Sequence, residues 1–194
     1  MNIKEVVNNM EFVNGIQMED IPELDLYMDQ VIQLFEAKLS AVKRNENEKI
    51  LTKTMINNYA KGKLLLPIKN KKYSKEHLIL MVLIYNLKGA LSISDIKLSL
   101  NNIIDNCTED DSYPLRELYD CYLENSEKDV LEFKSNIEDK AKNIEEKLKG
   151  NDVLQGEFEK NFLLLCSLVN MSNMYRRASE KLIDEFFTKI EGEE

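Results

Sequence analysis

The sequence predicts a mainly α-helical protein, and three observations lead to this fold class. Only 6 glycines and 3 prolines occur in 194 residues, so signals for turns are sparse. Apolar residues recur at steps of three and four over most of the chain, which is the period of an amphipathic helix. The most apolar runs, at 78–85 and 162–169, have the length of a core helix and are too short for a membrane span. We therefore expect a soluble, cytoplasmic protein that does not contact a membrane.

The first half of the chain is expected to form one module, residues 20–105, after a flexible acidic arm at 1–19. The arm is polar and only weakly periodic, so it is either a loose segment or one marginal helix. A strong helical pattern follows over about 24–42. Asp20 is a suitable N-cap for this helix, and Glu23 completes a capping box.

A short helix and a hairpin are predicted next. Thr52 is a suitable N-cap for a helix at about 53–61, and Gly62 follows where a C-cap is expected. Pro67 cannot continue a helix. The alternation of apolar and polar residues over 68–73 fits a short hairpin-like loop.

Two more helices complete the module. Ser74 precedes a helix at 75–88 that is apolar nearly all round, so we expect it to be the buried centre of the module. Ser92 and Asp95 form a capping pair at the start of a further helix at about 93–104.

The remaining residues, 106–194, are expected to form a helical region for dimerisation and regulation. Apolar residues at 123–148 follow a heptad pattern flanked by Glu and Lys, which is typical of a coiled-coil surface. The tripeptide Gly-Asn-Asp at 150–152 breaks the pattern and caps a second long helix that runs to about Lys189. Two such helices joined by a tight turn fold back as a helical hairpin or bundle. Apolar surface that the hairpin leaves open is expected to meet the N-terminal module or a second subunit.

Charge is unevenly distributed along this acidic chain, whose net charge is −9. Residues 49–97 contain 10 lysines and 2 acidic residues, whereas the flanking segments 1–48 and 98–194 are acidic. No Asp or Glu occurs from Lys49 to Lys75, a span of 27 residues with 8 lysines. A lysine-rich face can simply keep a domain soluble, but such faces usually mix Glu with Lys. We therefore expect the middle segment to meet an anionic partner.

Residues suited to catalysis or metal binding are few. His77 is the single histidine, and its place in the first turn of a helix suggests a partly exposed surface residue. Glu109, Asp110 and Asp111 form an acidic turn without the spacing and glycine of a calcium loop. The 3 cysteines are far apart, and no phosphate-binding loop, dinucleotide fingerprint or nucleophile elbow is present. The sequence predicts a protein that is not an enzyme and has no metal or cofactor.

The basic segment has the organisation of a nucleic-acid reader. The helices at 24–42 and 53–61 form a helix-turn-helix-like unit with a long turn, in which the start of the second helix faces base edges. Asn is a natural partner of adenine, and Thr of a base edge or a phosphate. Lysines at the end of that helix and in the following loop would contact the phosphate backbone. The expected DNA-binding residues are Thr52, Lys53, Thr54, Asn57, Asn58, Lys61, Lys63, Lys69, Lys71 and Lys72.

A family resemblance covers the same residues. The stretch LTKTMINNYAKGKLLLPIKNKKYSKEHLILMVLIYNLKGALSISDIKLSL, residues 51–100, resembles the winged helix-turn-helix of MerR-type regulators. Over about 20–100, where IPELDLYMDQV precedes this stretch, the chain is also similar to a family numbered 1836 among the domains of unknown function. The positions that match the MerR pattern are Thr52, Ile56, Tyr59, Leu64, Leu65, Pro67, Tyr73, Ser74, Ile93 and Ile96.

The MerR resemblance implies a regulator that binds double-stranded DNA and forms a homodimer through helices that follow the DNA-binding part. The heptad residues at 123–148 are a candidate for that dimer contact. Two departures weaken the implied base contacts but not the backbone contacts. Asn57 and Asn58 stand where MerR proteins usually have Arg and Tyr, and Gly62 comes one residue early. The sequence identifies no small-molecule effector.

A second reading of the same residues belongs to another class of function. In this alternative the chain is a helical adaptor for protein–protein interaction, its winged module does not bind DNA, and the basic face docks an acidic protein. The absence of the Arg-Tyr pair at 57–58 is the feature that favours it.

Overall fold

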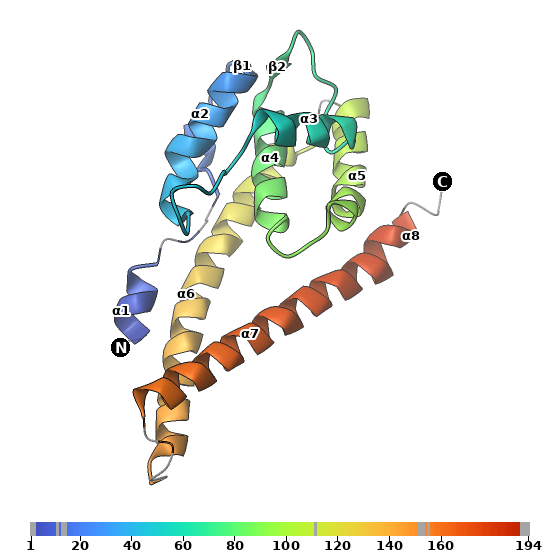
Figure 1. The fold of residues 1–194 in the computed structure, drawn as a ribbon. Coiled ribbons are helices and arrows are strands. Elements are labelled where there is room, and N and C mark those ends of the chain that lie inside the picture. Colours follow the sequence, from blue (N-terminus) through green and yellow to red (C-terminus); the bar gives the residue numbers. More distant parts are fainter. Residues whose placement is uncertain are drawn as a thin grey trace.

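The computed structural model describes residues 3–10, 12, 15–110, 112–150, 154 and 156–190. Over this part the chain is mainly helical with one short two-stranded sheet, which confirms the predicted fold class (Figure 1). None of the described helices is long and apolar enough to cross a lipid bilayer.

The segment expected as a flexible arm contains a short helix, α1 (Ile3–Asn8), which lies against the long helix α6. Val7 of this helix is buried, and Ile16 and Ile21 further along are buried as well. A 3-10 turn at Met18–Asp20 connects this segment to the module.

Helix α2 (Met28–Leu39) begins later than the sequence pattern predicted. Residues Leu26–Tyr27 form strand β1, which pairs antiparallel with strand β2 (Lys72–Tyr73). Because β1 pairs with a segment 46 residues away, the backbone before Met28 is extended, and Asp20 and Glu23 do not cap the helix. The N–H of Tyr27 instead donates to Oε1 of Gln30 at 2.8 Å.

The later helices of the module begin at the predicted caps. Thr52 caps α3 (Lys53–Lys61), where its Oγ1 accepts from the N–H of Met55 at 3.2 Å. Ser74 precedes α4 (Lys75–Leu87). Ser92 and Asp95 form the predicted capping box of α5 (Ile93–Glu109).

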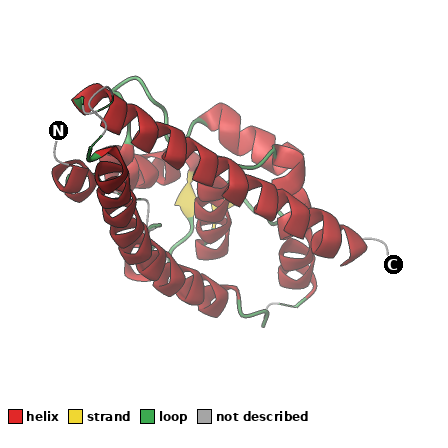
Figure 2. Cartoon of the chain, turned by 90° about the horizontal axis from the view of Figure 1, so that it is seen from below, coloured by secondary structure: helices red, strands yellow, loops and turns green. Residues whose placement is uncertain are grey.

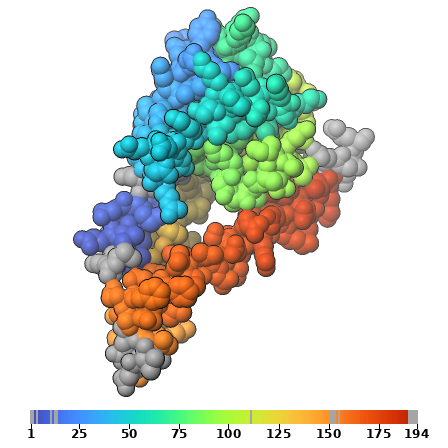
Figure 3. Space-filling model, in the orientation of Figure 1, coloured from blue at the N-terminus to red at the C-terminus, as the bar shows by residue number. Residues whose placement is uncertain are grey.

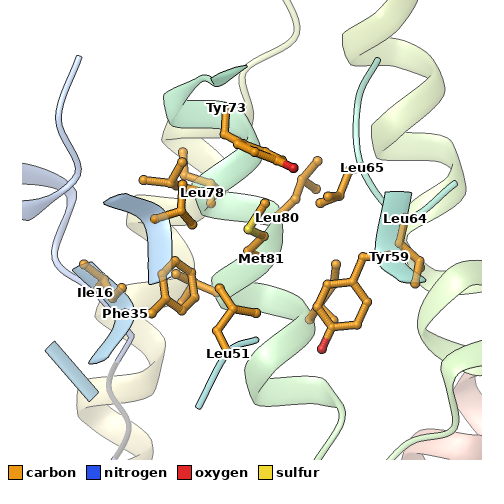
Figure 4. Packing of buried hydrophobic residues seen from close by; sticks show 14 of the residues in the cluster. Ile16, Phe35, Leu51, Tyr59, Leu64, Leu65, Tyr73, Leu78, Leu80 and Met81 are labelled. Carbon is orange, nitrogen blue, oxygen red and sulfur yellow. The ribbon is translucent and has the colours of Figure 1, made fainter. Parts of the chain in front are cut away.

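Helix α4 is the centre of the core, as its continuous apolar character predicted. Its buried side chains include Leu78, Leu80 and Met81, around which α2, α3, the hairpin and the N-terminal segment pack (Figure 4). Helix α5 adds Ile96, Leu100 and Ile104, and the start of α6 adds Leu115, Tyr119 and Leu123.

The C-terminal region consists of α6 (Leu115–Leu148) and α7 (Glu157–Leu182). A π-helical turn at Ile183–Phe187 and a short helix α8 (Thr188–Ile190) follow. Helices α6 and α7 meet near their connection and then diverge, so that the end of α7 returns towards α5 (Figures 1 and 2). Asn151 and Asp152, expected to break the first helix and cap the second, lie outside the described residues.

Candidate nucleic-acid interface

Helix α3 separates an apolar face from a polar one. Ile56 and Tyr59 point into the core and are buried. The opposite face is exposed and holds all of the expected α3 residues, which are Lys53, Thr54, Asn57, Asn58 and Lys61. Thr52 is half-buried, and its hydroxyl oxygen is engaged in the helix cap.

The end of α3 turns sharply through a left-handed residue. The N–H of Leu64 donates to the carbonyl of Tyr59 at 2.9 Å, and that of Lys63 to Ala60 at 3.1 Å. These two bonds form a Schellman motif, in which the residue after the C-cap is left-handed. That residue is Lys63, with φ 58°, because Gly62 keeps a right-handed φ of −73°. The side chain of Lys63 is exposed.

A tight hairpin follows Pro67. Lys69 and Lys72 form an antiparallel bridge, and the N–H of Lys72 donates to the carbonyl of Lys69 at 3.0 Å. Between them, Asn70 and Lys71 have φ values of 54° and 58°. Positive φ at both central residues is typical of a type I′ hairpin turn. Lys69 and Lys71 are exposed at this turn.

Left-handed backbone is concentrated in the lysine-rich segment. Among the described residues other than glycine, positive φ occurs at Lys63, Asn70 and Lys71. A left-handed conformation costs an L-residue with a Cβ about 1–2 kcal/mol, and Asn tolerates it better than Lys. Glycine would relieve the cost at Lys63 and Lys71. Lys63 and Lys71 thus carry exposed charged side chains on backbone that is strained for a residue with a Cβ.

Two of the expected lysines, and the neighbouring Lys75, are engaged by other side chains. Nζ of Lys53 lies 2.7 Å from Oδ1 of Asp29, and both side chains are exposed. Nζ of Lys72 lies 5.3 Å from the ring centroid of Tyr27, across the β1–β2 pair. Lys75 is unavailable to a ligand, because it is 7% exposed and its Nζ lies 2.6 Å from Oε1 of Glu23.

His77 is buried, so the expectation of a surface histidine is wrong. Its Nδ1 accepts from the N–H of Ser74 at 3.1 Å, and its Nε2 lies 3.2 Å from the carbonyl oxygen of Leu66. Burial lowers the pKa of His77, although the Leu66 carbonyl acts in the opposite direction. His77 therefore joins the start of α4 to the chain that leads into the hairpin. No local sequence signal indicates this contact, because Leu66 approaches only in the folded chain.

Arg116 at the start of α6 connects the long helix to the first turn of α4 and to the segment before β1. Its Nε and Nη2 donate to Oε1 of Glu76 at 2.9 and 2.7 Å, and its Nη1 donates to Oε2 of Glu23 at 3.0 Å. Burial raises the pKa of Glu76, but the bonds from Arg116 and the backbone hold it below its ordinary value. The bond from Lys75 lowers the pKa of Glu23.

Helix α3 and the hairpin are neighbours on the same side of the module. Figure 1 shows α3 across the front of the module, with the hairpin rising above it. The space-filling view in the same orientation shows both segments on the visible face, well away from α7 (Figure 3). The segments that carry the expected residues thus lie on one side of the module, where Thr52 is partly enclosed.

Metal chemistry has no support in the described part of the chain, where no three His, Cys, Asp or Glu residues are grouped to hold an ion. Asp110 of the acidic turn bonds to Ser112, while Asp111 lies outside the described residues.

Comparison with known proteins gives one match. Residues 16–122 match the family described as domain of unknown function (DUF1836), and this span is more than half of the chain. Neither the curated proteins nor the solved structures contain a match. The matched span runs from the buried Ile16 to the third turn of α6, and thus includes α3, the hairpin and Arg116. The chain belongs to the DUF1836 family.

Proposed function

We propose that this protein is a transcriptional regulator that binds duplex DNA through a MerR-like winged helix-turn-helix. In this proposal α2 and α3 are the two helices of the motif, and the hairpin at 67–73 is the wing. The observation that carries the proposal is the exposed, lysine-rich face shared by α3 and the hairpin tip, whose own residues include no Asp or Glu. Asp29 of α2 approaches this face at Lys53.

The topology around this face supports the proposal. The strand before α2 pairs with the strand that closes the hairpin, so α3 and the hairpin are held against one core. His77 of α4 is bonded to Leu66, which leads into the hairpin, and Arg116 of α6 is bonded to Glu76 in the first turn of α4. A wing placed by such bonds presents its lysines at a constant distance from α3, which a rigid DNA backbone requires.

Each part of the face has a proposed role. Asn57 and Asn58, exposed one turn into α3, contact base edges in the major groove. Lys61 and Lys63 at the helix end, and Lys69 and Lys71 on the hairpin, contact phosphates. Phosphate contacts position a protein on DNA, whereas base contacts specify the sequence.

The electrostatic part of binding is testable by salt. If about six phosphates are neutralised, the affinity falls roughly a thousandfold between 50 and 200 mM salt. Fluorescence anisotropy with mixed genomic duplexes over this range measures the slope. Absence of salt-sensitive binding at the lowest salt would contradict the proposal.

A charge-reversal pair locates the wing. In Lys69→Glu/Lys71→Glu, we expect binding to be lost at 100 mM salt, because both side chains are exposed at the hairpin tip. The control is Lys147→Glu/Lys149→Glu, which makes the same change of charge at an exposed site on the far end of α6. Equal binding by the two double variants would remove the hairpin from the interface.

The second candidate function is a protein-interaction adaptor whose basic face docks an acidic protein. The asparagines at 57 and 58, in place of Arg and Tyr, favour it, as does the neutralisation of Lys53 by Asp29. Asn57→Ala/Asn58→Ala separates the two functions. For a DNA reader, this change narrows the difference in affinity between preferred and random duplexes. An adaptor has no such preference to lose.

A further inference from the structure

Helix α7 carries apolar side chains on more than one face, and most of them are exposed in the described chain. Leu164 faces α6 and is buried. On another face lies a row that we call the outer stripe, and it consists of Phe158, Phe162, Leu165 and Val169. These side chains are 75%, 52%, 56% and 52% exposed, respectively. The rings of Phe158 and Phe162 are stacked with centroids 6.0 Å apart, so the stripe has a continuous apolar surface.

The heptad residues of α6, which the sequence suggested for dimerisation, are largely used inside the chain. Leu123 lies in the module core, and Ile137 and Leu148 are buried where α1 and α7 pack on α6. Phe133 makes an edge-to-face contact with Phe12, at 5.6 Å between centroids. More exposed apolar surface therefore remains on α7 than on α6, although Leu131 of α6 is 69% exposed.

The size of the outer stripe is that of an interface. With about 150–250 Å² for each aromatic side chain, the exposed fractions correspond to roughly 400 Å² of apolar surface per chain. Patches of this size on a monomer often mark a contact site. Two such stripes placed together, with their flanking residues, reach the roughly 1,000 Å² that a specific interface needs.

We infer that the outer stripe binds the outer stripe of a second copy of this chain, with the two α7 helices antiparallel. The intervals between the four residues are 4, 3 and 4, which read the same in both directions. A two-fold axis near 163–164 therefore brings Phe158 opposite Val169 and Phe162 opposite Leu165. The same patch then serves both subunits, as a closed dimer requires.

Charge at the two ends of the stripe also fits the antiparallel arrangement. Glu157 and Glu159 lie at its N-terminal end, and Arg177 lies beyond its C-terminal end, where Arg176 is paired with Glu180 of the same helix. Antiparallel helices bring the acidic end of one copy towards the basic end of the other, whereas parallel helices place like charges together. The space-filling view shows α7 at the margin of the molecule, away from α3 and the hairpin, so this contact leaves the proposed DNA-binding face open (Figure 3).

Sedimentation velocity of the full chain tests the contact without DNA. We expect a mass near twice the 22.6 kDa of one chain, with dissociation on dilution. Leu165→Asp weakens the dimer by about a hundredfold or more, because it places a charge at the centre of the contact. The matched control is Leu131→Asp on α6, where the side chain is 69% exposed and outside the stripe. A wild-type chain that is monomeric overturns the inference, also where that monomer binds anionic lipid vesicles. The inference is likewise overturned if Leu165→Asp and Leu131→Asp weaken the dimer equally.

Cross-linking tests the orientation and does not depend on a destabilising change. In a chain whose native cysteines are replaced, Phe158→Cys and Val169→Cys are made separately and treated with a short bismaleimide. The mixture cross-links, and neither variant alone does, because equivalent residues at the stripe ends lie roughly 16 Å apart along antiparallel helices. Cross-linking of Phe158→Cys to itself overturns the antiparallel arrangement.

Discussion

Nε2 of His77 lies 3.2 Å from the carbonyl oxygen of Leu66, so a buried histidine in α4 holds the residue before Pro67. Nδ1 of the same ring accepts from the N–H of Ser74. A ring nitrogen that accepts this bond carries no proton, and the proton must therefore be on Nε2, where it is donated to Leu66. The hairpin is thus attached to α4 by the neutral form of His77.

Acid should destabilise the protein through His77. Because burial lowers its pKa, the unfolded chain takes up the proton first as the pH falls below the ordinary value of about 6.5. The contribution of neutral His77 to the unfolding free energy is therefore fully present above pH 6.5. It declines as the pH falls below 6.5, until His77 of the folded protein is protonated too. Urea midpoints at pH 7.5, 6.5 and 5.5 measure the decline. His77→Gln can keep both hydrogen bonds without titrating, so its midpoints should change less over this range. If the urea midpoint of His77→Gln declines as much as that of the wild type, the decline comes from titratable groups other than His77.

Replacement of Lys63 by glycine should raise stability and weaken DNA binding. Glycine adopts φ near 58° without the steric cost that lysine bears, so Lys63→Gly should be about 1 kcal/mol more stable than Lys63→Ala. Thermal unfolding measures the difference. At Lys61, which lies in the right-handed helix α3, we expect Lys61→Gly to be less stable than Lys61→Ala, because glycine lowers helix stability. All four variants lose one positive charge, so all should bind duplex DNA more weakly than the wild type.

Tyr119 should contribute strongly to the attachment of the N-terminal segment. Its hydroxyl donates to the carbonyl of Ile16 at 2.7 Å and accepts from the N–H of Ile16 at 3.2 Å, in a fully buried position. Tyr119→Phe leaves both backbone groups of Ile16 without a partner and should cost about 2 kcal/mol of unfolding free energy. Urea denaturation tests this value. Tyr175→Phe, at an exposed position of α7, is the control and should cost almost nothing.

Arg116 should stabilise the protein most at neutral pH. Although burial alone raises the pKa of Glu76, the bonds from Arg116 hold it below about 4.5. This contribution is present above pH 4.5 and is lost as the pH falls through the lowered value, which is a different window from that of His77. Because Arg116 is half-exposed, we expect Arg116→Ala to cost about 1 kcal/mol or less at pH 7 and progressively less as the pH falls below 4.5. Arg177→Ala, on α7, should have no pH-dependent effect.

Local signals predicted the helices of the module well, because they depend on neighbours within four residues. Thr52, Ser92 and Asp95 cap the helices that they were expected to cap, and the apolar run of α4 became the buried centre. The predicted start of α2 was wrong for a related reason. Strand β2 of the hairpin pairs with Leu26–Tyr27, so the backbone there is extended. The helical period of the sequence carries no information about a strand partner so far along the chain.

The candidate site shows the same division. The exposed face of α3 follows from helical spacing, which places Thr54, Asn57, Asn58 and Lys61 together. Composition alone did not separate the exposed lysines from Lys75, whose burial depends on Glu23, 52 residues earlier.

The sequence by itself therefore determined the helices, their caps and the basic character of the segment at 49–75, because period, cap chemistry and charge are properties of adjacent residues. Only the tertiary structure decided that His77 is buried, that Lys63 and Lys71 are left-handed, and that more apolar surface is exposed on α7 than on α6. Each of these depends on which distant segments meet, since packing excludes water from some side chains and leaves others, of the same chemistry, at the surface.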